Sequence, residues 1–294
     1  MIAVIGNGGL GTGLAGLLTR LGLGVSLLGR DDTSRTEHEI FLPGSDAPYV
    51  FSTLPPTSAT LAKALAVFVT VKAFDLKSAL TQHLRRFPTA IPIVPVGNGH
   101  IYDELCELRG RYPDFLWRLG VCTIACRPVA DGRIRLGNPK AKLIWGPLSK
   151  AEPRVATESA WLELDPGLFQ WQTDPFPAYR TKWIFNTTLN TLAAALRLRT
   201  NGDVLAHSEE LEAVFSEAYA LAQNLWPSGA AEKAKLYGEL LILIDETRLN
   251  QNSMNQDREL GKRTESEFLA GLAENYPGFP ILKKYHRTLI GAAS

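Results

Sequence analysis

The sequence predicts an α/β fold: an N-terminal Rossmann dinucleotide-binding domain followed by an all-α C-terminal domain. The chain opens with an apolar strand, a glycine-rich turn and a helical pattern, which together make a βαβ unit. Further apolar, β-branched runs, typical of strands buried on both faces of a parallel sheet, follow up to residue 96. Beyond residue 175 the apolar spacing is helical almost to the last residue. We therefore expect a dinucleotide-binding domain over 1–174 and a helical substrate domain over 175–294.

The glycine-rich turn joins a strand over residues 2–5 to a helix, and a second strand follows over residues 25–28. Gly6 permits a tight turn, Gly8 lets the backbone approach a pyrophosphate, and Gly11 allows close helix-to-strand packing. The N–H groups at a helix N-terminus favour an anion. The alternative is a purely structural glycine turn. We expect dinucleotide binding by Gly6, Asn7, Gly8, Gly9, Leu10 and Gly11.

The end of the second strand indicates which dinucleotide is bound. A carboxylate at this point suits the ribose 2′-hydroxyl of NAD, whereas an arginine suits the 2′-phosphate of NADP. Here Gly29 is followed by Arg30, and then by Asp31 and Asp32. We expect Arg30 to select NADPH. The alternative is a small shift in register that gives the ribose to Asp31.

Composition excludes several classes of partner. The chain has 294 residues and a net charge of +1, with no Lys/Arg run, so nothing favours nucleic acid or an anionic membrane. Three cysteines, Cys106, Cys122 and Cys126, have spacings unlike a disulfide framework or a zinc site, so we expect no metal. No charged leader and no membrane-length apolar run is present, and we expect a cytoplasmic protein.

Two further strands end at polar residues. A run over 67–71 ends at Lys72, and one over 91–96 ends at Gly97-Asn98-Gly99. With the glycine turn and Arg30, four features then follow four strand ends, the edge at which doubly wound sheets bind ligands. Taken singly, a residue such as Lys72 or Asn98 is more often a solvated loop residue, and it is the coincidence of four such features at one edge that favours ligand binding.

The rest of the first half gives a weaker pattern. Residues 30–50 read as a connection, and 115–145 as a small antiparallel extension completing the sheet, with turns at Asp131-Gly132 and Asn138-Pro139. A last strand is expected over 168–171.

The second half contains one helix with an unusual polar stripe. Helices are expected over 179–197, 208–225, 230–249, 264–276 and 281–290. In the first of them, Lys182, Asn186 and Asn190 fall at i, i+4 and i+8 in an otherwise apolar sequence. Burying these groups is costly without a partner, and a polar ligand is such a partner. The alternative is an ordinary solvent-facing stripe.

The segment 249–265 is the other polar stretch. Asn250, Ser253 and Asn255 are expected to form a hydrogen-bonding loop, and Thr264 with Glu267 has the spacing of a capping box. Glu265 then falls in the first turn of the next helix. Taken alone, its simplest role is a favourable interaction with the helix dipole.

These motifs together resemble the ketopantoate reductase (2-dehydropantoate 2-reductase) family over nearly the whole chain. The matching residues are Gly6-x-Gly8-x-x-Gly11, Arg30, Val71-Lys72-Ala73-Phe74, Asn98-Gly99, Lys182-x-x-x-Asn186-x-x-x-Asn190, Asn201-Gly202, Asn250-x-x-Ser253-Met254-x-Gln256-Asp257 and Arg263-Thr264-Glu265. The resemblance implies NADPH-dependent reduction of a 2-keto acid between the two domains, most simply ketopantoate to pantoate in pantothenate biosynthesis.

The resemblance also implies roles for single residues. Lys182 would be the general acid, and Glu265 would be the second catalytic residue, lying between cofactor and substrate. Substrate would be held by Lys182, Asn186, Asn190, Asn201, Asn250 and Ser253. The cofactor would be contacted by Arg30, Lys72, Asn98, Ala125 and Glu265 in addition to the glycine turn.

Three departures from the family pattern bear on the substrate: Gly97 where glutamine is usual, His100 in place of a small or apolar residue, and Asn252 in place of a second serine. A related protein that reduces another 2-keto acid, or a non-catalytic NADP sensor, are the alternatives. His100 is the alternative acid. No other partner is expected, and we expect a monomer or a homodimer.

Overall fold

The computed structural model describes residues 1–30, 36–129, 133–137, 141–149, 152–227 and 232–291. It divides into two compact units, which we describe separately. The first comprises Met1–Gly97 with Ile101–Phe176, and the second comprises Asn98–His100 with Pro177–Ser294. The sequence placed its single boundary after residue 174 and gave no sign that Asn98–His100 would pack with the second unit.

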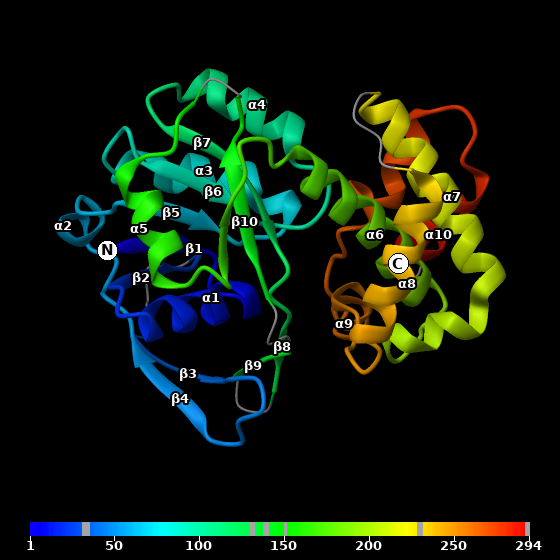
Figure 1. Ribbon diagram of the computed structural model, residues 1–294, viewed down its shortest axis with the longest axis horizontal. Helices are drawn as coiled ribbons and strands as arrows, with labels where there is room; N and C mark the ends of the chain where they lie inside the picture. The colour runs from blue at the N-terminus through cyan, green and yellow to red at the C-terminus, as the bar shows by residue number, and fades with distance from the viewer. Residues whose placement is uncertain (31–35, 130–132, 138–140, 150–151, 228–231, 292–294) are drawn as a thin grey trace. The chain divides into compact units, whose positions relative to one another are not determined.

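The first unit is built on a seven-stranded sheet of order β11-β10-β7-β6-β5-β1-β2 (Figure 1). Its strands are β1 (Ile2–Ile5), β2 (Val25–Leu28), β5 (Ala66–Val69), β6 (Pro92–Pro95), β7 (Leu116–Cys122), β10 (Leu143–Pro147) and β11 (Phe169–Trp171). The strands from β7 to β2 are parallel, and β10 is antiparallel to β7. Because the chain winds outward from β1 in both directions, the end of β1 is the switch point of a doubly wound sheet. The predicted α/β class is confirmed.

A second sheet of order β4-β3-β9-β8 corrects two expectations. Its strands are β3 (Glu37–Phe41), β4 (Pro48–Ser52), β8 (Cys126–Pro128) and β9 (Ile134–Leu136). The segment 30–50, read as a connection, contains a hairpin. In the predicted extension over 115–145, β7 and the antiparallel β10 complete the main sheet, whereas β9 pairs with β3 of the hairpin and β8 pairs with β9. The alternation of Glu37 and Glu39 with a buried residue could not be recognised in the sequence, because that buried residue is the polar His38. The turns expected at 131–132 and 138–139 lie outside the described residues.

The helix α1 (Gly9–Arg20) packs between the main sheet and the second sheet (Figure 1). Its glycines make this possible: a Cβ on Gly16 would lie 2.3 Å from Ile40 Cδ1, and one on Gly13 would lie 2.7 Å from Cys126 Sγ. The described residues of the unit form the further helices α2 (Ser58–Leu61), η1 (Ala73–Asp75), α3 (Leu76–His83), η2 (Leu84–Arg86), α4 (Tyr102–Arg111) and α5 (Ala156–Leu164).

A buried ion pair anchors α5 to the sheet. Arg118 on β7 and Glu158 on α5 have fully buried side chains, with Arg118 Nε donating to Glu158 Oε1 at 2.7 Å and Nη2 donating to Oε2 at 2.9 Å. Trp145 Nε1 donates to the same carboxylate at 3.1 Å, and the backbone N–H of Val155 donates at 3.0 Å. Since every strong acceptor direction is used, the buried charge is compensated.

The second unit is helical. It contains α6 (Phe176–Ala195), η4 (Asn201–His207), α7 (Ser208–Leu225), α8 (Lys233–Glu246), α9 (Ser253–Glu259), η5 (Ser266–Phe268), η6 (Ala270–Asn275) and α10 (Pro280–Gly291). None of the helices in the described ranges is long and apolar enough to cross a membrane.

Two expectations in this unit were wrong. Ser253 and Asn255 lie in the helix α9 and not in a loop, because Asn252 caps its N-terminus. The segment 264–276 forms two short 3₁₀ helices, separated by the non-helical backbone of Leu269 (φ −123°, ψ −107°). Glu265 itself occupies the cap position of η5, and Glu267 pairs with Arg263, so the predicted capping box is absent.

Candidate functional site

The glycine turn forms at the end of β1. Gly6 has φ +109°, a conformation that favours glycine, and a Cβ on Gly11 would lie 1.7 Å from Gly6 O. The Thr70 hydroxyl donates to the carbonyl oxygens of Ile5 at 3.0 Å and Gly6 at 3.1 Å, which braces the turn. Gly8 occupies the N-cap position of α1, and nothing lies within 4 Å of a Cβ built on it. The turn is thus held firmly and leaves space for a phosphate beside the helix N-terminus.

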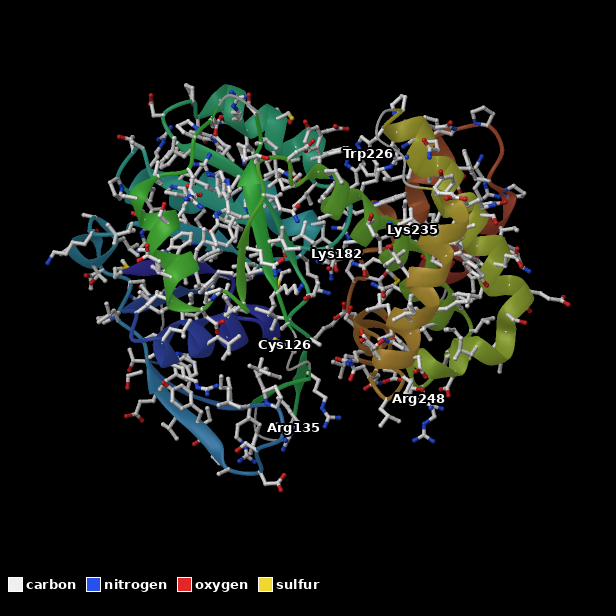
Figure 2. All side chains as sticks on the ribbon, viewed as in Figure 1. Cys126, Arg135, Lys182, Trp226, Lys235 and Arg248 are labelled. Atoms are coloured by element: carbon white, nitrogen blue, oxygen red, sulfur yellow. The ribbon has the colours of Figure 1, made fainter. Side chains whose placement is uncertain are left out.

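The other members of the turn also have defined surroundings. Asn7 lies over Gly29 at the end of β2, where a Cβ would meet its Nδ2 at 2.4 Å. Gly9 faces Cys126, which Figure 2 labels on β8, and Leu10 is half-buried against the core. Ala125 is half-buried between β7 and β8, and its carbonyl accepts a hydrogen bond from Gly137 N at 2.9 Å.

Arg30 and Lys72 follow β2 and β5, the two neighbours of β1 in the sheet. The Arg30 side chain is 83% exposed, and its Nη2 donates to Asp75 Oδ2 at 2.8 Å. Lys72 is half-buried and caps η1, the short helix that ends in Asp75. The glycine turn, Arg30 and Lys72 therefore share one edge of the sheet. Asp31, the alternative ribose ligand, lies outside the described residues.

In the second unit, α6 carries the predicted polar stripe, with Lys182 labelled in Figure 2. Lys182 and Asn186 are half-buried, and Asn190 is 8% exposed. Asn186 Nδ2 donates to Asn98 Oδ1 at 3.2 Å. The structure thus brings together Asn98 and the helix stripe, although they lie far apart in the sequence.

The carbonyl oxygen of Phe268 connects three segments of this unit. It accepts hydrogen bonds from the backbone N–H of His100 at 2.8 Å and from Trp183 Nε1 at 3.1 Å, while Phe268 N donates to Glu265 O at 3.0 Å. Because Trp183 adjoins Lys182, the segments bearing the Asn98 loop, Lys182 and Glu265 are held at fixed positions relative to one another.

Aromatic packing supports the same arrangement. The His100 ring stacks on Trp226 with centroids 5.1 Å apart, and Trp226 also meets Trp183 edge-on at 5.4 Å and Tyr179 at 5.8 Å. Tyr179 Oη donates to Gly99 O at 3.1 Å. His100, considered from the sequence as an alternative acid, is therefore a packing partner of Trp226 in this structure.

Glu265 is 4% exposed. The alternative role of this residue, an interaction with a helix dipole, would involve η5, a 3₁₀ helix of three residues whose N-cap position Glu265 occupies. The next residue, Ser266, is hydrogen bonded through Oγ to His286 Nδ1 on α10 at 2.7 Å, which fixes the chain at this point.

The remaining predicted substrate residues are Asn201 on η4, Ser253 on α9, and Asn250 in the segment that precedes α9. Asn201 N donates to Asn250 O at 2.9 Å, and Asn201 Nδ2 donates to Thr247 Oγ1 at 3.1 Å. Ser253 is exposed in the first turn of α9. Among the described residues, no three His, Cys, Asp or Glu side chains come together in a way that could hold a metal ion.

Sequence comparison decides the family. The profile described as ketopantoate reductase PanE/ApbA matches residues 2–150, and the profile of its C-terminal part matches residues 178–273. The chain belongs to the ketopantoate reductase family. This membership makes it an oxidoreductase of the 2-dehydropantoate 2-reductase type and confirms the resemblance that the motifs indicated.

Individual relatives agree with the family. A 2-dehydropantoate 2-reductase of Salmonella typhimurium is 25% identical over 211 residues, which cover 72% of this chain and 67% of the relative. A PanE/ApbA family ketopantoate reductase from Ralstonia eutropha superposes with a TM-score of 0.81 at 19% identity, covering 100% of this chain and 98% of that one. D-mandelate dehydrogenase in a ternary structure with NADH and anilino(oxo)acetate superposes equally well, with a TM-score of 0.81 at 15% identity and the same coverage. The fold is therefore shared, and related structures bind a nicotinamide cofactor.

The sequence did not predict the contacts of two residues in this ketopantoate reductase family member. Asp75, the partner of Arg30, stands three residues after Lys72, and its charge beside a predicted phosphate site was the available signal. Asn252 is 4% exposed and donates to Asn190 Oδ1 at 2.7 Å. Its difference from the family pattern was the signal in that case.

Proposed function

We propose that this protein reduces a 2-keto acid with NADPH, and that ketopantoate, converted to pantoate for pantothenate biosynthesis in the cytoplasm, is the substrate. The observation that carries the proposal is the stripe on α6. Lys182, Asn186 and Asn190 share one side of a helix, and Asn186 is joined to Asn98 by an amide hydrogen bond. A non-catalytic NADP sensor has no need for such a stripe.

The first unit fits a dinucleotide. The glycine turn offers an open helix N-terminus, which suits a pyrophosphate, and the exposed Arg30 guanidinium suits a 2′-phosphate through two charge-assisted hydrogen bonds. Lys72 and Ala125 would add contacts in this unit, and the family resemblance implies further cofactor contacts by Asn98 and Glu265 of the second unit. When bound, the reduced nicotinamide would supply a hydride to the keto carbon.

The residues of the second unit would do the rest of the chemistry. As the keto oxygen becomes an alkoxide, the Lys182 ammonium supplies a positive field and then the proton. Asn186, Asn190, Asn201, Asn250 and Ser253 would orient the substrate through hydrogen bonds. Glu265 would complete the substrate contacts. It is buried, and the next residue, Ser266, is held by its hydrogen bond to His286.

The substrate is tested with a panel. Purified protein is mixed with NADPH and either ketopantoate, other branched 2-keto acids or an aromatic 2-keto acid such as phenylglyoxylate, and NADPH oxidation is followed by its near-ultraviolet absorbance. The aromatic acid is included because the D-mandelate dehydrogenase structure is as similar as the reductase structures. Ketopantoate should give the highest kcat/KM, and failure of the whole panel would refute the proposal.

Lys182→Ala should lower turnover by about 10² to 10⁴ while NADPH affinity barely changes, because only the proton and the charge opposite the alkoxide are lost. Lys235→Ala is the matched control, since Lys235 lies on α8 with an exposed side chain and a long 4.0 Å contact to Glu239. A Lys182→Ala protein that retains more than about a tenth of wild-type turnover would reassign the acid, with His100 the next candidate.

A further inference from the structure

Asn252 makes three hydrogen bonds with one amide. Its Oδ1 accepts from the backbone N–H groups of Met254 at 2.9 Å and Asn255 at 3.2 Å, and its Nδ2 donates to Asn190 Oδ1 at 2.7 Å. We propose that Asn252 is a positioning residue that fixes the orientation of the Asn190 amide, so that Asn190 presents its N–H donors to the carboxylate of the substrate. The inference rests on the proposed function for the identity of that ligand.

The orientation follows from hydrogen-bond chemistry. An amide's oxygen and nitrogen look alike in shape, so the direction of an asparagine side chain has to be deduced from its partners. Met254 N–H and Asn255 N–H are both donors, and only the oxygen of Asn252 can accept from them. The nitrogen of Asn252 must therefore face Asn190, and Asn190 must meet it with its oxygen.

Burial makes this arrangement hard to reverse. Asn252 is 4% exposed and Asn190 is 8% exposed, so water cannot readily replace a lost partner. Turning the Asn190 amide over would bring two N–H donors together in a buried place and leave both without acceptors. Asn252 itself cannot turn, because its oxygen caps α9.

The consequence for recognition lies on the other side of Asn190. Because Asn190 Oδ1 accepts from Asn252, the polar group of Asn190 that can bind a ligand is the amide NH₂ at Nδ2, which only donates hydrogen bonds. Across the described part of the chain, Asn190 Nδ2 takes part in no hydrogen bond. Asn190 also shares its helix stripe with the Lys182 ammonium. A hydrogen-bond donor on the same helix stripe as an ammonium suits an anionic carboxylate and disfavours a neutral carboxamide.

Asn252→Asp reverses this polarity with little change in shape. The introduced carboxylate still accepts from both backbone N–H groups, so the cap is kept. Its second oxygen can only accept, so the Asn190 amide has to turn and donate to it, leaving Asn190 Oδ1 toward the substrate. We expect the ratio of kcat/KM for the 2-keto acid over its 2-keto amide to fall about 10-fold to 100-fold, chiefly through KM for the acid. NADPH affinity and melting temperature should stay near wild type.

Two variants serve as controls. Gln251→Glu places the same new charge one residue away on an exposed side chain that bonds Glu259, without contact to Asn190, and should leave the ratio unchanged. Asn252→Ser keeps a capping oxygen but loses the contact with Asn190, and should lower the ratio to an intermediate value. If Asn252→Asp does not fold, the Asn252→Ser result decides.

The side-chain amide signals of Asn190 in ¹⁵N–¹H spectra give a readout independent of turnover. In Asn252→Asp the Asn190 signals should move downfield, because the amide NH₂ of Asn190 becomes a donor to the introduced carboxylate. Unchanged amide signals, or an acid-to-amide ratio within about twofold of wild type, would overturn the inference. A wild-type protein that reduces no 2-keto acid while the signals move as expected would refute only the proposed function.

Discussion

Arg30→Ala should collapse the preference for NADPH over NADH. In this structure the Arg30 side chain is 83% exposed and bonded to Asp75 at 2.8 Å. An ion pair this exposed is worth about 0 to 1 kcal/mol, whereas two charge-assisted hydrogen bonds to a 2′-phosphate are worth roughly 1.5 to 3 kcal/mol. The phosphate should therefore displace Asp75, and Arg30→Ala should weaken NADPH binding about 10-fold to 150-fold. NADH has no 2′-phosphate, so its affinity should change little.

Asp75→Asn tests the same reasoning from the other side. Removing the competing carboxylate should strengthen NADPH binding by at most about fivefold, the equivalent of 1 kcal/mol, and should leave NADH nearly unaffected. Glu107→Gln is the matched control, because Glu107 forms a similar exposed ion pair with Lys77 at 2.7 Å and has no place in the proposed site.

Titration of both cofactors, followed by nicotinamide fluorescence at low and at physiological ionic strength, measures these affinities. The NADPH preference should shrink as salt rises, since exposed charges are screened. Wild-type binding of NADH as tight as that of NADPH would refute the assignment of Arg30. Damage confined to Asp31→Ala would instead give the ribose to that carboxylate.

Three further changes test other parts of the molecule. Glu265→Ala should weaken substrate binding as well as turnover, measured by KM and kcat, and a change in melting temperature alone would indicate a purely structural role. Glu158→Ala should lower the free energy of unfolding by about 3 to 5 kcal/mol in urea titrations, because it removes the carboxylate that faces the fully buried Arg118 and leaves this charge with the single 3.1 Å ion pair to Glu152. A loss below about 1 kcal/mol would contradict this. Burial lowers the pKa of His286, and this effect is larger than the opposite effect of the carboxylates of Glu274 and Glu267. As the pH falls, His286 is therefore protonated at a higher pH in the unfolded chain than in the folded protein. The contribution of His286 to stability should therefore be fully present above about pH 6.5 and should decline as the pH falls below that value. The melting temperature, measured between about pH 7.5 and 5.5, should fall less in His286→Asn than in wild type. An equal fall in both proteins would exclude His286 as the source.

The glycine turn and the polar stripe of α6 could be predicted from the sequence alone. Both are local: three glycines within six residues follow a strand, and Lys182, Asn186 and Asn190 repeat at the period of a helix. Local spacing also predicted the boundaries of α7 correctly. Such features need no knowledge of distant partners, because backbone geometry alone places the residues on one turn or one helix face.

The hydrogen-bond partners of these residues depend on the tertiary structure. Asn252 and Asn190 lie 62 positions apart, and Asn186 and Asn98 lie 88 apart, so no periodicity links either pair. The second sheet was missed for the same reason, because its strands β3 and β9 are far apart in the sequence: Ile40 pairs with Ile134, and Phe41 pairs with Arg135. Hydrogen bonds between buried side chains depend on which elements pack together and on the direction of each amide. Packing places the partners, and the donors and acceptors around Asn252 then allow its amide only one orientation.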